Sequence, residues 1–120
     1  MKEYFDFVEK CAINKEDKVF FNSGPIHASI VMSRIFEYSK NEVRIFSGGF
    51  SGAVSNDLLY LNSLERFLER PNSSMKIIVE DYSTNKTSKI YDVLRKYFNQ
   101  SIIEQGVERK KIELYETTVK

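Results

Sequence analysis

Residues 43–81 read VRIFSGGFSGAVSNDLLYLNSLERFLERPNSSMKIIVED. The stretch opens with an apolar run at 43–46 and closes with a second one at 75–79. Between them lie a loop of small residues and a pattern with the apolar spacing of a helix. Two short apolar runs joined through a helix predict parallel strands, and such a connection is right-handed in nearly all proteins. The sequence therefore predicts a βαβ unit here.

The flanking segments extend this unit into a small α/β domain that spans residues 1–120. Because the first run is apolar apart from Arg44, we expect its strand to be buried on both faces. Asn56 or Asp57 is expected to cap the helix that follows. Residues 100–106 are ambiguous, and we expect Ile102 and Ile103 to pack on the core. The predicted helices are 3–12, 26–40, 57–70 and 87–99, the predicted strands are 43–47, 75–80 and 111–116, and the predicted core contains Val31, Ile45, Leu64, Phe67, Ile77, Val79 and Leu94. The fold class is α/β, a parallel βαβ core in two or three layers.

Composition narrows the function classes. The chain has 120 residues, 42% hydrophobic and 29% charged, with a net charge of +1. This balance argues against nucleic acid as a partner, because such domains usually carry a basic stripe. Cys11 is the single cysteine, so we expect a packed thiol and a reducing compartment. No apolar run approaches the ~18–20 residues of a membrane span. These features predict a cytoplasmic protein that needs no metal or other cofactor.

Two polar segments follow the two predicted parallel strands, where open α/β sheets bind ligands. The first is the glycine loop, which either makes a tight turn or cradles an anion at the start of the next helix. Phe50 lies between glycines and could stack on a base or ligand. The second is the carboxylate pair after the other strand, which either ends the strand or binds a metal or a ribose hydroxyl. The candidate ligand-binding residues are Ser47, Gly48, Gly49, Phe50, Ser51, Gly52, Ser55, Asn56, Glu80 and Asp81.

The stretch from about residue 21 to 115 resembles a half-domain of the phospholipase D-like fold. The resemblance rests on the helix that opens with His27, on the strand KNEVRIFSG at 40–48 and on the strand KIIVED at 76–81. Enzymes of that family carry a His-x-Lys motif. Here Ala28 and Ser29 follow His27, which is the one histidine in the chain, so the motif is absent. The resemblance implies the fold without the family's phosphodiesterase activity.

Three function classes follow. The first is a non-catalytic phospholipase D-like domain for binding or assembly, with a homodimer or a protein partner joined through the last strand. The second is a small enzyme that binds a phosphate-bearing ligand or nucleotide at 48–52. The third is a nucleic-acid-associated protein, which the charge balance disfavours. We expect the first class, and His27 is then a surface or capping group.

Overall fold

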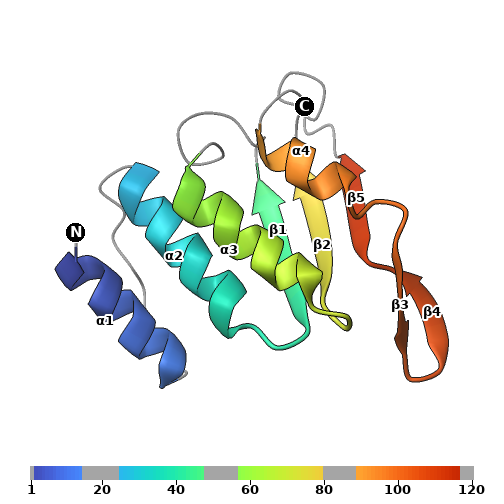
Figure 1. Cartoon of the computed structure of the whole chain (residues 1–120), viewed down its shortest axis with the longest axis horizontal. Helices are drawn as coiled ribbons and strands as arrows, with labels where there is room; N and C mark the ends of the chain where they lie inside the picture. The colour runs from blue at the N-terminus through green and yellow to red at the C-terminus, as the bar shows by residue number, and fades with distance from the viewer. Residues whose placement is uncertain (1, 15–24, 48–56, 80–88, 117–120) are drawn as a thin grey trace.

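The computed structural model describes residues 2–14, 25–47, 57–79 and 89–116 (Figure 1). Four helices and five strands lie in this part of the chain. The helices are α1 (Lys2–Ile13), α2 (Pro25–Tyr38), α3 (Leu58–Glu69) and α4 (Lys89–Arg95), and the strands are β1 (Glu42–Ser47), β2 (Ser74–Val79), β3 (Ser101–Glu104), β4 (Val107–Lys110) and β5 (Ile112–Glu116). The predicted α/β class is thereby confirmed.

The main sheet has the strand order β1-β2-β5, and both pairings are parallel. The register places Val43 beside Met75 and Met75 beside Ile112. The predicted parallel pairing of the first two strands and the inclusion of the last strand in the same sheet are both confirmed. A second, antiparallel sheet consists of β3 and β4 alone.

The core lies on one side of the main sheet. Met75, Ile77 and Val79 of β2 are at most 1% exposed and pack against α3 and α4, whereas Ile78 between them is 37% exposed. Figure 1 shows α3 and α4 in front of the strands, with α2 alongside α3. The expectation that β1 is buried on both faces is wrong, because Arg44 is exposed. Within the described residues the fold has two layers, with the other sheet face left open (Figure 1).

Helix α3 begins where the sequence predicts. Asp57 is its N-cap, and Oδ1 of Asp57 accepts hydrogen bonds from the backbone N–H groups of Leu59 (2.9 Å) and Tyr60 (3.4 Å). Leu64 and other apolar residues of the helix face the sheet. The capping carboxylate also complements the positive end of the helix dipole. The alternative cap, Asn56, lies outside the described residues.

Two cationic side chains, one half-buried and one buried, donate hydrogen bonds to backbone carbonyls at the C-terminal ends of α2 and α3. The Arg70 guanidinium donates to the backbone carbonyls of Ser39 (2.6 Å), Glu37 (3.0 Å) and Phe36 (3.4 Å) at the end of α2. Nζ of Lys111 donates to the carbonyls of Arg70 (2.8 Å) and Ser73 (3.0 Å) after α3. Cations stabilise the last carbonyls of a helix. These bonds therefore tie α2 to α3, and α3 to the start of β5.

The segment after α4 differs from the prediction. The helix ends at Arg95 rather than at residue 99, since Lys96 and Tyr97 bond to carbonyls three residues back. Residues 100–106, for which the sequence predicts no definite element, contribute strand β3 and the turn of the β3–β4 hairpin. The turn residues Gln105 and Gly106 have φ angles of 51° and 78°. Positive φ at both positions is typical of a type I′ turn, which matches the twist of a two-stranded ribbon.

The predicted core list is largely confirmed. Leu64, Phe67, Ile77, Val79 and Leu94 are fully buried, and Ile45 is partly buried against the same cluster. Val31 is only half-buried, because Ile30 and Phe36 take the inward positions of α2. Ile102 is buried as expected, at 6% exposed, although it lies outside the main core cluster. Ile103 is 73% exposed, contrary to expectation, because neighbouring strand residues point to opposite faces.

Candidate functional site

The predicted ligand site at the carboxyl ends of β1 and β2 falls mostly outside the described residues. Ser47 ends β1 and is the register partner of Val79, which ends β2. The two strands therefore finish side by side, which is the premise of that prediction. Its other members, Gly48, Gly49, Phe50, Ser51, Gly52, Ser55, Asn56, Glu80 and Asp81, lie outside the described residues, so the site stays a prediction.

Ser29 and Asp57 are the described polar side chains that meet at the start of α3. Oγ of the buried Ser29 donates to Oδ1 of Asp57 at 2.7 Å. The same oxygen accepts from the backbone N–H of Leu59. Because the hydroxyl proton points to a carboxylate that is already engaged in capping, Ser29 is held in a structural role. The pair fastens α2 to the start of α3.

The open face of the main sheet is a second candidate site, and its side chains form two rows across the strands. Register pairs Arg44 with Lys76, and Lys76 with Glu113, in a charged row. The next row toward the carboxyl ends pairs Ile78 with Tyr115. Ile78 is 37% exposed and Tyr115 is 57% exposed. The open face is therefore charged in its middle and apolar toward the carboxyl ends of the strands.

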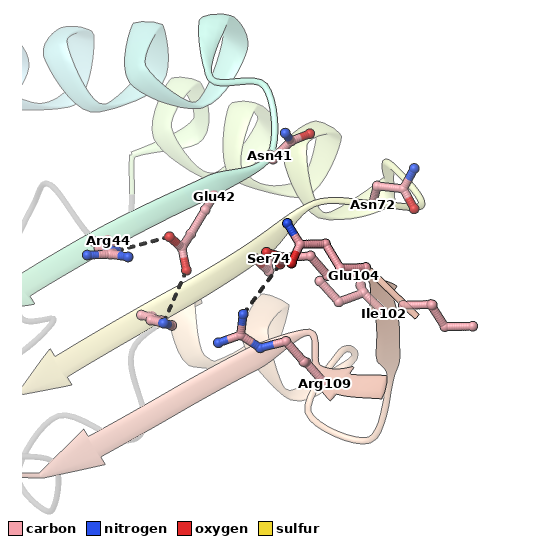
Figure 2. A pocket seen from close by; sticks show the side chains of 11 residues that line it. Asn41, Glu42, Arg44, Asn72, Ser74, Ile102, Glu104 and Arg109 are labelled. Atoms are coloured by element: carbon pink, nitrogen blue, oxygen red, sulfur yellow. Dashed lines mark hydrogen bonds and ion pairs between the residues drawn. The ribbon is translucent and has the colours of Figure 1, made fainter. Parts of the chain in front are cut away.

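A groove of about 570 Å³ lies between the amino half of this face and the β3–β4 hairpin (Figure 2). Side chains of β1 and β2 form one wall, and those of the hairpin form the other. The lining residues are Asn41, Glu42, Arg44, Asn72, Ser74, Lys76, Ile102, Ile103, Glu104, Gln105 and Arg109. We call this the hairpin groove.

Glu42 is the electrostatic centre of the β1–β2 wall. Its carboxylate accepts from Nε of Arg44 at 3.0 Å and lies 3.6 Å from Nζ of Lys76 (Figure 2). Desolvation raises the pKa of Glu42, but the hydrogen bond and charge of Arg44 and the charge of Lys76 outweigh it, so the pKa lies below its usual value. The carboxylate thus remains ionised at neutral pH and positions both cations.

The hairpin wall carries a looser ion pair. Nη1 of Arg109 lies 3.5 Å from Oε2 of Glu104 across the two strands (Figure 2). Both side chains are partly exposed, at 39% and 53%. Because both side chains are exposed to this extent, their charges are accessible to a ligand, and the pair itself contributes little to stability.

The hairpin groove offers a ligand charged and hydrogen-bonding side chains. Its described side chains are amides, one hydroxyl, aliphatic groups, cations and carboxylates, without cysteine or histidine. Across the part of the chain that the structure describes, no group of three or more histidine, cysteine or acidic residues could hold a metal ion. Guanidinium, ammonium and amide groups recognise anions and peptide bonds through hydrogen bonds.

The hairpin groove was not predicted, because β1 was expected to be buried on both faces. The signal was present in the alternation of polar residues, with Glu42 and Arg44 in one run and Ser74 and Lys76 in the other. Alternation of this kind indicates a sheet with one solvated face. The hairpin was harder to find, since Gln-Gly is a weaker turn signal than Asn-Gly or Asp-Gly.

Comparison with known proteins finds no family model, no curated protein and no solved structure that matches this chain. Among the helices of the described ranges, none has the length and apolar character needed to cross a bilayer.

Proposed function

We propose that this chain is a non-catalytic α/β domain of the phospholipase D-like type that binds a protein partner through the open face of its sheet. The observation that carries the proposal is the burial pattern of β2, in which Met75, Ile77 and Val79 are buried while Ile78 is exposed. Parallel sheets occur almost only with both faces covered. The parallel face that the described helices and strands leave open is therefore a surface that a partner would complete.

The apolar row supports a protein partner. Ile78 and Tyr115 are register neighbours on β2 and β5, and both side chains are exposed. Contiguous apolar side chains on a surface mark interaction sites, and aromatic residues are enriched at the centres of interfaces. Burial of this row would stabilise a complex through the hydrophobic effect.

The residue content supports binding rather than hydrolysis. Phospholipase D-like chemistry uses two histidines, one as nucleophile and one as acid, whereas this chain has His27 alone and no His-x-Lys motif. We expect no hydrolysis of phosphodiesters in nucleic acid, phospholipid or chromogenic substrates. Turnover that disappears in His27→Ala would contradict the non-catalytic assignment.

Photo-crosslinking tests the docking surface. A benzoylphenylalanine side chain replaces Tyr115 on the open face or, as the matched control, Leu58, which is 70% exposed at the start of α3. In cells that produce the chain naturally, we expect a discrete protein adduct from position 115 and none from position 58. Equal labelling at both positions, or no adduct at position 115, would refute the proposal.

The alternative function is a small enzyme that binds a phosphate-bearing ligand or nucleotide at residues 48–52. The register of Ser47 with Val79 favours this function. Because β1 and β2 end side by side, the segments that follow them start close together, at the edge where open α/β sheets bind ligands. A thermal-shift series with phosphate, nucleotides and divalent metals tests this function. A melting temperature that rises with ligand concentration supports it, and an unchanged melting temperature excludes it.

A further inference from the structure

We propose that the hairpin groove is the docking site for an extended, acidic segment of a partner protein, with carboxylates spaced between apolar side chains. The inference rests on the proposed function and names the chemistry of its partner. It is carried by the arrangement of Arg44, Lys76 and Arg109 around the groove and by the apolar row beside it.

The cations of the groove have more donors than the described carboxylates use. Arg44 makes its hydrogen bond to Glu42 through Nε, one of five N–H donors on a guanidinium. Lys76 shares the same carboxylate at 3.6 Å, and Arg109 reaches Glu104 at 3.5 Å. The side chain of Arg44 is 72% exposed. An arriving carboxylate therefore finds charged donors without displacing the internal glutamates.

The spacing of charges favours a protein segment over nucleic acid. Glu42, Glu104 and Glu113 stand among the cations of the groove and its margin, where Lys110 is also found. A nucleic-acid strand carries a negative charge at every phosphate, so these glutamates would repel part of it. A peptide with carboxylates on alternate residues can place these carboxylates against the cations and can direct its apolar side chains away from the glutamates.

The shape and rim of the groove suit an extended backbone. Asn41, Asn72 and Gln105 are exposed at the rim, and their amides can donate to and accept from peptide groups. Ile103 on the hairpin and Ile78 on β2 supply exposed apolar contacts at the two sides. Small-molecule sites are mostly apolar and enclose their ligand, whereas this groove is polar with an exposed rim.

A peptide titration followed by amide NMR tests the inference. The isotope-labelled full chain is titrated with a short acetylated peptide that alternates glutamate with leucine. The matched control peptide replaces each glutamate with lysine, and a thymidine oligonucleotide provides the nucleic-acid arm. We expect saturable shifts for Lys76, Ile102 and Arg109 with the acidic peptide alone, weakening as salt rises.

Charge reversal locates the site. In Lys76→Glu the acidic peptide should bind roughly tenfold more weakly, because a like charge then faces it, whereas Arg95→Glu on α4 should bind it as the unmodified chain does. Spectra without peptide verify that each variant is folded. Equal binding of the basic peptide or the oligonucleotide, shifts away from the groove, or an unchanged Lys76→Glu affinity would each overturn the inference.

The two proposals fail separately. A crosslinked partner at position 115 together with no binding of the acidic peptide would reject the acidic segment and leave the open face as the docking surface. Acidic-peptide binding at the groove without any adduct at position 115 would retain the groove and reject docking over the apolar row.

Discussion

Replacing the buried Lys111 with methionine should destabilise the fold through the turn between α3 and β2. Lys111 is 2% exposed, and its Nζ donates to the carbonyls of Arg70 and Ser73 and to Oγ of Ser73 at 3.0 Å. In Lys111→Met the Arg70 carbonyl keeps its bonds from the backbone N–H of Ser73 (3.3 Å) and from the Ser73 hydroxyl (2.9 Å). Within the described residues, the Ser73 carbonyl is left without any hydrogen-bond donor.

The expected loss of stability follows from this one carbonyl acceptor that is left without a donor. A buried carbonyl left without a partner costs about 1–3 kcal/mol. Methionine preserves most of the aliphatic stem, and it removes the desolvation cost of a buried ammonium, which offsets part of the loss. We therefore expect the free energy of unfolding to fall by a net amount in the lower part of that range, about 1–2 kcal/mol.

Urea denaturation at neutral pH measures this change, with the exposed neighbour Lys110→Met as the matched control. A loss smaller than about 0.5 kcal/mol, which is the usual range for surface substitutions, would refute the reasoning. The pH dependence gives a second readout. Burial lowers the pKa of Lys111 in the folded chain below its ordinary value of 10.5. Between the folded pKa and 10.5 the unfolded chain therefore binds more protons than the folded chain. The stability of the unmodified chain relative to Lys111→Met should therefore rise with pH in that window.

Four further predictions concern other parts of the fold. Leu64→Ala should lower the free energy of unfolding by about 2–5 kcal/mol, since Leu64 is fully buried, and a loss below that of an exposed Leu58→Ala control would contradict the packing described. The pKa of Glu42 is lowered, so its stabilising contribution is present above the ordinary value of 4.5 and is lost as pH falls through the folded pKa. Glu42→Gln should therefore lose less stability in acid than the unmodified chain, and parallel curves of stability against pH for the two would argue against the ion pairs. Gly106→Ala should cost about 1–2 kcal/mol because φ is 78° there, and faster amide exchange in β3 and β4 would report it. Since β5 lies at one edge of the main sheet, we retain the prediction of a homodimer through that edge, which light scattering at micromolar concentrations would exclude by giving the mass of a monomer.

Much of the fold could be predicted because local signals agreed with the tertiary arrangement. The apolar runs of β1 and β2, the Asp57 cap and the apolar face of α3 all lie within a continuous stretch of chain. The end of α4 was harder to predict, because the apolar spacing of Tyr97 and Phe98 continues past Arg95 although the backbone turns. Those two residues are partly buried against the core, which explains their apolar character without a helix.

The sequence by itself determined the α/β class, the parallel βαβ unit and most of the core, because hydrophobic periodicity reports which side of each element is buried. Only the tertiary structure decided that the described helices cover one face of the sheet and leave the other open, and that the hairpin lies beside the open face. Burial on one face or two depends on which elements pack there, and that information is distributed over the whole chain. For the same reason, the groove joins Glu42, Lys76 and Arg109, which are far apart in sequence and meet through strand register and the path of the chain into β5.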